Sequence, residues 1–91
     1  MADDTPIWQP PKQVDEEHAA TIQEIGKKLK QQRDNTNLSV KQYAENIGIS
    51  RISYAQMERG EIYFSLRNLL IILSHHGIDL KTFIETDIEN L

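Results

Sequence analysis

The chain has 91 residues, a net charge of −4 at pH 7 and no cysteine. Its length suits a single domain, and the absence of cysteine excludes disulfide bonds, thiolate metal sites and thiol chemistry. No window approaches about 18 consecutive apolar residues, and the N-terminus lacks the basic and apolar regions of a secretory signal. The sequence therefore predicts a cytoplasmic protein with no membrane contact.

The charges are unevenly distributed along the chain. All lysines and arginines except Lys12 and Lys81 lie within residues 21–67, whereas the segments on either side are net acidic. A basic centre between acidic ends indicates that the middle of the chain faces a polyanion, although the protein as a whole is acidic.

Residues 1–14 form the first segment. They are polar and acidic and contain all three prolines, a composition that predicts a flexible, acidic and proline-rich arm. Trp8, the only tryptophan, lies in this arm. Two hypotheses stand for it: a loosely docked aromatic side chain, or a contact for a protein partner, because an aromatic residue in a proline-rich segment can be a recognition element.

The rest of the chain carries the signals of five helices, of which two come first. Asp15 can cap a helix that ends before Asp34, where a run of turn-forming residues begins. Ser39 opens the second helix, and Ser39 and Gln42 match a capping box, in which each side chain satisfies a free amide of the other residue. Gly48 ends this helix by adopting a left-handed conformation.

The other three helices are bounded in the same way. Ser50 caps a third helix, which ends at Gly60. Ser65 caps a fourth helix that ends at Gly77, and Asp79 can cap a short fifth helix. The fourth helix is the most apolar of the set, which predicts a central place in the core.

The second and third helices are joined very tightly. Only Ile49 lies between the glycine that ends one helix and the serine that caps the next. Two short helices joined in this way pack at a steep angle, as in a helix-turn-helix unit. Ile47, Tyr54 and Met57 are predicted to face the shared core, which leaves the outer side of the third helix exposed.

Residues 38–60, with the sequence LSVKQYAENIGISRISYAQMERG, resemble the Cro/C1-type (Xre) helix-turn-helix family, and the similarity continues more weakly from Ile25 to Ile84. The resemblance implies an all-α fold, a five-helix lambda-repressor-like bundle over residues 15–85, followed by a short acidic tail at residues 86–91. It also implies sequence-specific binding of double-stranded DNA by a transcriptional regulator. The features that carry it are Leu38-Ser39, Ala44-Glu45, Ile47-Gly48-Ile49-Ser50 and Glu58-Arg59-Gly60.

The same resemblance implies which side chains contact DNA, because the N-terminal part of the third helix enters the major groove in this motif. Arg51 can bond bidentately to guanine and Gln56 to adenine, and Ile52 can contact a thymine methyl group. Ser50 can cap its helix and touch a phosphate. The residues that can neutralise phosphates as a group, although each could also be an ordinary surface charge, are Lys27, Lys28, Lys41, Arg59 and Arg67.

Two further features follow from the resemblance. Arg33 and Glu58 are expected to form a partly buried structural ion pair that ties the first helix to the end of the third. Family members commonly dimerise, so that two recognition helices meet half-sites about one helical turn apart. The residues that either form a homodimer surface or cover the core are Phe83, Ile84, Ile88 and Leu91.

Two alternative functions stand beside that of an operator-binding regulator. One is an antitoxin-type autorepressor. The other is a protein-interaction module that retains the fold without specific DNA binding, and it is suggested by the acidic ends, by Val40 and by the Glu61–Phe64 loop. The family often has glutamine where Val40 stands and a basic or polar loop after Gly60. A protein partner would then use this loop or the Trp8 arm.

Catalytic and metal chemistry are not predicted. His75 and His76 are adjacent on a helix and so point in different directions, and Asp79 lies beyond Gly77, whereas a metal site needs three or four converging ligands. No nucleophile–base arrangement or glycine-rich phosphate loop is present. The sequence therefore predicts no enzyme, no metal site and no cofactor.

Overall fold

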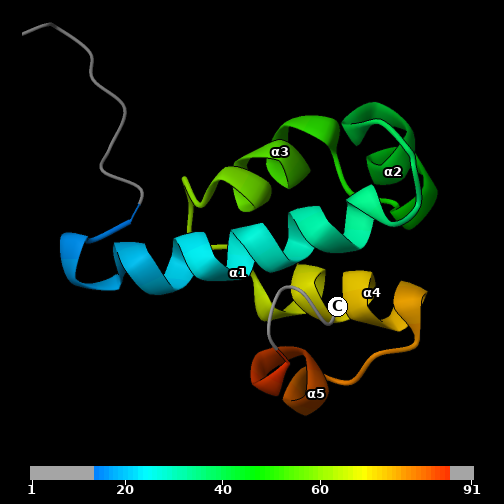
Figure 1. Ribbon diagram of the computed structural model, residues 1–91. Coiled ribbons are helices and arrows are strands. Elements are labelled where there is room, and N and C mark those ends of the chain that lie inside the picture. The colour runs from blue at the N-terminus through cyan, green and yellow to red at the C-terminus, as the bar shows by residue number, and fades with distance from the viewer. Residues whose placement is uncertain (1–13, 87–91) are drawn as a thin grey trace, which may run out of the picture.

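The computed structural model describes residues 14–86, and within this part the protein contains helices and no strands. Its elements, in chain order, are α1 (Glu16–Asp34), α2 (Val40–Ile47), α3 (Arg51–Arg59), α4 (Leu66–His76) and α5 (Leu80–Glu85) (Figure 1). The prediction of an all-α, five-helix bundle is confirmed. The predictions for Trp8, Ile88 and Leu91, and for nearly all of the arm and tail that hold them, lie outside the described residues.

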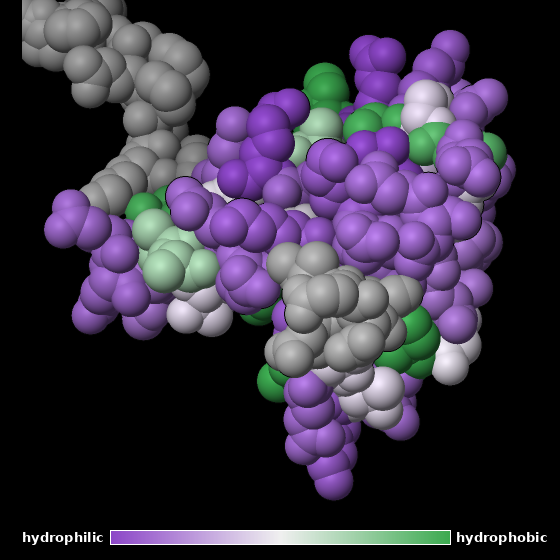
Figure 2. All heavy atoms as spheres, in the orientation of Figure 1, coloured by the Kyte–Doolittle hydropathy of each residue, from purple (hydrophilic) through white to green (hydrophobic). Residues whose placement is uncertain are grey.

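The long helix α1 lies through the middle of the molecule (Figure 1). Helices α2 and α3 lie on one side of it, and α4 and α5 lie on the other. Burial of Ile47, Tyr54 and Met57 confirms the predicted inner face of the helix-turn-helix unit. The face shown in Figure 2 is mostly hydrophilic, with apolar residues in small patches. The core that both sides share consists of Leu29, Tyr43, Ala44, Ile47, Ile49, Tyr54, Met57, Leu69, Ile72, Leu73 and Phe83.

Local capping defines where α2, α3, α4 and α5 begin. In each case a side-chain oxygen accepts a hydrogen bond from the backbone N–H three residues on, at 3.1 Å for Ser39, 3.0 Å for Ser50, 3.0 Å for Ser65 and 2.8 Å for Asp79. The predicted side-chain cap at Asp15 is wrong. Its carboxylate instead accepts a hydrogen bond from the Tyr63 hydroxyl at 3.0 Å, so it connects the start of α1 with the loop after α3.

Helices α1 and α3 cross very closely at Gly26, which is buried. A Cβ atom built on Gly26 would lie 2.7 Å from the carbonyl oxygen of Met57 and closer still to that of Glu58. Real Cβ atoms are essentially never found under 3.0 Å from such a neighbour, so glycine is what lets the two backbones approach. The glycine costs α1 some helix propensity, about 1 kcal/mol relative to alanine, and in return α3 packs directly against it.

We expect Gly26→Ala to destabilise the fold by about 1–3 kcal/mol, because the added methyl group forces two helix backbones apart. Helix propensity alone predicts a change of the opposite sign. Thermal or urea unfolding of this variant, measured beside Lys27→Ala at the adjacent exposed position, checks the expectation. A Gly26→Ala protein as stable as the wild type would show that α1 and α3 do not approach this closely.

A hydrogen bond between Tyr43 and His76 connects α2 with α4. The Tyr43 hydroxyl oxygen and the His76 Nε2 lie 2.5 Å apart, and the two rings are stacked with their centroids 5.7 Å apart. Burial raises the pKa of the Tyr43 hydroxyl to about 12, so this group keeps its proton and can donate it to the Nε2 atom of a neutral imidazole. Burial, with a smaller contribution from His75, lowers the pKa of His76 and favours the same neutral form.

We therefore expect the fold to lose stability as the pH falls below the ordinary histidine pKa of 6.5. Because the pKa of His76 is lower in the fold than in the unfolded chain, the unfolded state binds the proton first, and the stabilisation present at neutral pH is lost on acidification. Urea unfolding at about pH 7.5 and about pH 5.5 measures this loss. The loss should be smaller for His76→Gln, and unchanged for His18→Gln on the exposed start of α1. Equal losses in the wild type and His76→Gln would contradict the assignment.

Candidate nucleic-acid interface

The turn between α2 and α3 is compact because its residues have separate structural roles. Gly48 has a φ of 79°, in the left-handed region, and its N–H donates to the Ala44 carbonyl at 3.0 Å. The N–H of Ile49 donates to the same carbonyl at 3.1 Å, and the Ile49 side chain is buried in the core. Ser50 then caps α3. The first turn of α3 is thereby held in one position relative to α2.

The outer face of α3 carries the residues predicted to contact bases. Ser50 and Arg51 are exposed at its start, Ile52 is 68% exposed, and Gln56 is half-buried. Ile52 and Gln56 are four residues apart and so lie on the same side of the helix, whereas Tyr54 is directed into the core. Ile52 and Gln56 therefore lie together on one side of α3, while Ser50 and Arg51 are exposed at its N-terminal end.

The N-terminal ends of α2 and α3 are electropositive. Neither helix has an acidic residue in its first turn, so the partial positive charge of the free N–H groups is not neutralised there. Lys41 in the first turn of α2 and Arg51 in the first turn of α3 are exposed and add full positive charges. Helix ends of this kind favour anions, and phosphate groups in particular.

A protein-family model described as helix-turn-helix matches residues 29–83, which is more than half of the chain and includes all of α2, α3 and α4. The chain belongs to the Cro/C1-type helix-turn-helix (Xre) family. In general terms it is therefore a DNA-binding regulator. Searches of curated proteins and of solved structures found no match.

Most of the predicted phosphate-binding residues of this Xre-family domain are exposed. Lys41 lies in the first turn of α2 and Arg59 at the last position of α3, so both belong to the helix-turn-helix unit itself. Lys27 lies on α1 and Arg67 in the first turn of α4, and these two helices pack against α3 and α2, respectively. Four cations of the predicted set are therefore carried by the helix-turn-helix unit or by helices in contact with it.

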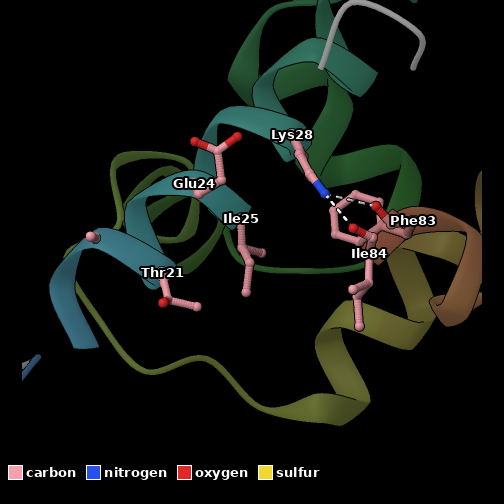
Figure 3. Close-up of a pocket in the computed structure, with 7 residues that line it drawn as sticks. Thr21, Glu24, Ile25, Lys28, Phe83 and Ile84 are labelled. Atoms are coloured by element: carbon pink, nitrogen blue, oxygen red, sulfur yellow. Dashed lines mark hydrogen bonds between the residues drawn. The ribbon is translucent and has the colours of Figure 1, made fainter. Parts of the chain in front are cut away.

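Lys28 does not belong to this set, and its predicted phosphate contact is wrong. The residue is only 9% exposed, and its Nζ donates hydrogen bonds to the carbonyl oxygens of Phe83 at 3.0 Å and Ile84 at 2.9 Å (Figure 3). Both carbonyls lie in α5 close to its C-terminal end, where the helix dipole favours a cation. Lys28 therefore fastens α5 to α1 and is directed away from α3.

A groove of about 450 Å³ lies beside Lys28, between α1 and α5 (Figure 3). Helix α5 is on the opposite side of α1 from α3 (Figure 1), so this groove lies away from the outer face of α3. Phe83 is 1% exposed and belongs to the core, which leaves Ile84, at 60% exposure, as the described member of the predicted dimer surface. The groove is lined by Ala20, Thr21, Glu24, Ile25, Lys28, Phe83 and Ile84.

The loop between α3 and α4 is engaged mostly within the fold. Ile62 and Phe64 pack against the core, and the Tyr63 hydroxyl is bonded to the carboxylate at the start of α1. Val40 also packs against the core. Ile62, Phe64 and Val40, which suggested a protein-interaction module in sequence, are thus packed within the fold itself, whereas Tyr63 remains 48% exposed.

Residues 14–86 hold neither a metal-binding cluster nor a membrane-spanning helix. No three His, Asp or Glu side chains in this part of the chain are grouped so as to hold a metal ion. His76 faces Tyr43, and His75 is exposed. None of the helices between residues 14 and 86 combines the length and apolar character that crossing a bilayer requires.

A bidentate ion pair between Arg33 and Glu58 fixes the far end of α3 against α1. Arg33 Nε donates to one carboxylate oxygen at 2.6 Å and Nη2 to the other at 3.2 Å, while Nη1 donates to the Leu38 carbonyl at 2.9 Å. The two side chains are only 14% and 8% exposed. The hydrogen bonds to Glu58 raise the pKa of Arg33 further above its usual value. The pair thus joins α1, α3 and the start of the α2 segment.

Sequence reasoning missed a second arginine–glutamate pair one residue further along. Arg59 Nε and Nη2 donate to the two carboxylate oxygens of Glu61 at 2.9 Å and 3.2 Å, across the glycine that ends α3. Both side chains are exposed, at 60% and 49%. A spacing of two residues is not a helical pairing distance, so the only signal in the sequence was the presence of opposite charges on either side of Gly60.

We expect Glu58→Gln to destabilise the fold by up to about 3–5 kcal/mol, because it removes the main counter-charge of the partly buried Arg33 guanidinium. The matched control is Glu61→Gln, the same chemical change in the exposed pair, which should alter stability much less because water screens that pair. Urea unfolding of both variants measures the difference. Similar small effects of the two substitutions would show that the Arg33–Glu58 pair does not hold α3.

Proposed function

We propose that this protein is a transcriptional regulator that binds a specific sequence of double-stranded DNA, with α3 as the recognition helix. The observation that carries the proposal is the outer face of α3, where Arg51 and Ile52 stand exposed at the electropositive start of the helix and Gln56 follows one turn later. Ile52, which is 68% exposed, presents an apolar side chain on this face, where it can contact a thymine methyl group.

The side chains on this face match the chemistry of base recognition in the major groove. We assign Arg51 to guanine O6 and N7, Gln56 to adenine N6 and N7, and Ile52 to a thymine methyl group. Ser50, whose oxygen already accepts the Ser53 N–H at 3.0 Å, still has its hydroxyl proton free to donate to a phosphate. Phosphate contacts that place the helix are assigned to Lys27, Lys41, Arg59 and Arg67.

The protein is further proposed to act as a homodimer on a two-fold symmetric operator. A nine-residue recognition helix reads only a few base pairs, and two copies placed about 34 Å apart double the site. The exposed Ile84 on α5 is proposed to belong to the dimer surface. Repression by occupying the operator, including autorepression of the antitoxin type, needs nothing beyond this arrangement.

The first experiment is a selection of duplex DNA from a random pool, followed by salt titration of the enriched site. We expect a palindromic site, and a loss of about 1–3 kcal/mol per half-site for Arg51→Ala that is confined to one base pair of each half-site. Lys41→Ala should instead weaken binding to every sequence and reduce the salt slope of the dimer by about 1.8, which is about 0.9 for each half-site.

Lys81→Ala is the control, because it removes one exposed charge from α5, on the far side of α1. It should bind like the wild type. The proposal fails if no sequence is enriched, or if Arg51→Ala binds the enriched site as tightly as the wild type does.

A further inference from the structure

Arg59 lies on the recognition face of α3. It follows Ile52 by seven residues and Gln56 by three, and residues with this spacing form one stripe along a helix. Its side chain is 60% exposed. A guanidinium at the C-terminal end of this stripe is therefore on the surface that the proposed function turns toward DNA.

The same guanidinium is already occupied within the protein. Glu61 takes its Nε and Nη2 donors in a bidentate pair, at 2.9 Å and 3.2 Å. These are donors that a phosphate group would use, because an arginine binds carboxylates and phosphates through the same planar fork. In the free protein Glu61 thus fills the place of a phosphate.

The backbone holds Glu61 in this place. At the end of α3, the N–H of Gly60 donates to the Met57 carbonyl at 3.2 Å and the N–H of Glu61 donates to the Gln56 carbonyl at 3.0 Å. Gly60 has a φ of 68° and lies so close to α1 that an added Cβ atom would be 2.8 Å from the Cα of Gln23. The carboxylate therefore starts from a fixed backbone position two residues from Arg59.

The Arg59–Glu61 pair is much more exposed than the neighbouring Arg33–Glu58 pair. The Arg33–Glu58 side chains are 14% and 8% exposed, whereas those of Arg59 and Glu61 are 60% and 49% exposed. Exposed ion pairs contribute little net free energy, because water screens them. The Arg59–Glu61 pair can therefore open at small cost when a stronger anion approaches.

We propose that Glu61 is an intramolecular competitor for the phosphate contact of Arg59, so that DNA binding proceeds by exchange of a carboxylate for a phosphate on the Arg59 guanidinium. This inference rests on the proposed function. Its consequence is that Glu61 lowers the affinity for duplex DNA in two ways. Its carboxylate occupies Arg59 before DNA binds, and after being displaced from Arg59 this carboxylate repels the nearby phosphate.

A double-mutant cycle tests the exchange, with the selected duplex as the probe. Affinities are measured for the wild type, Glu61→Gln, Arg59→Ala and the double variant in the same low-salt buffer. We expect Glu61→Gln to bind about two- to tenfold more tightly than the wild type. The double variant should gain less than half as much over Arg59→Ala, when both gains are expressed as logarithms of the affinity ratio.

Glu45→Gln is the matched control, because Glu45 is an exposed glutamate on α2 of the same helix-turn-helix unit. Its gain reports the general effect of removing one negative charge near DNA and should be the same in both backgrounds. An unchanged affinity of Glu61→Gln, or an equal gain with and without Arg59, would overturn the exchange while leaving duplex binding established. Failure of every variant, wild type included, to bind any duplex would instead refute the proposed function, and the exchange with it.

Discussion

The close crossing of α1 and α3 is the constraint on which the rest of this structure depends. Helix α3 has nine residues, too few to be stable alone in water, so its position is set by what it packs against. Gly26 lets the two backbones meet near the middle of α1, and the Arg33–Glu58 pair joins them near its end. Because one side of α3 is held in this way, the opposite side is presented to solvent as a defined surface.

Two arginine–glutamate pairs with the same bidentate geometry have different consequences because their surroundings differ. Glu58 and Arg59 are consecutive residues, yet Glu58 turns inward to a nearly buried guanidinium and Arg59 turns outward to an exposed carboxylate. A buried pair cannot lose a partner without leaving an uncompensated charge, so it acts as a permanent link. An exposed pair opens at little cost, and we propose that the Arg59 guanidinium then exchanges Glu61 for a phosphate.

The net negative charge of the protein does not conflict with an anion-binding surface. Association with DNA depends on the local field, and the first turns of α2 and α3 carry Lys41 and Arg51 without an acidic residue beside them. Lys28 and Lys27 are adjacent in sequence, but only Lys27 is exposed. Lys28 is buried and bonded to α5, so its positive charge links two helices and adds nothing to the surface. The position of each charged side chain in the fold therefore decides its role, whereas the net charge of the protein does not.

The sequence by itself determined the helices and the inner face of the helix-turn-helix unit, because caps and apolar periodicity depend on residues three or four positions apart. Ser39, Ser50 and Ser65 cap their own helices, and a local pattern is sufficient to predict that. Only the tertiary structure decided that Asp15 binds Tyr63, that Lys28 binds Phe83 and Ile84, and that Tyr43 binds His76. These partners are distant in sequence, and their contacts follow from which sides of two helices happen to meet, which no local pattern encodes.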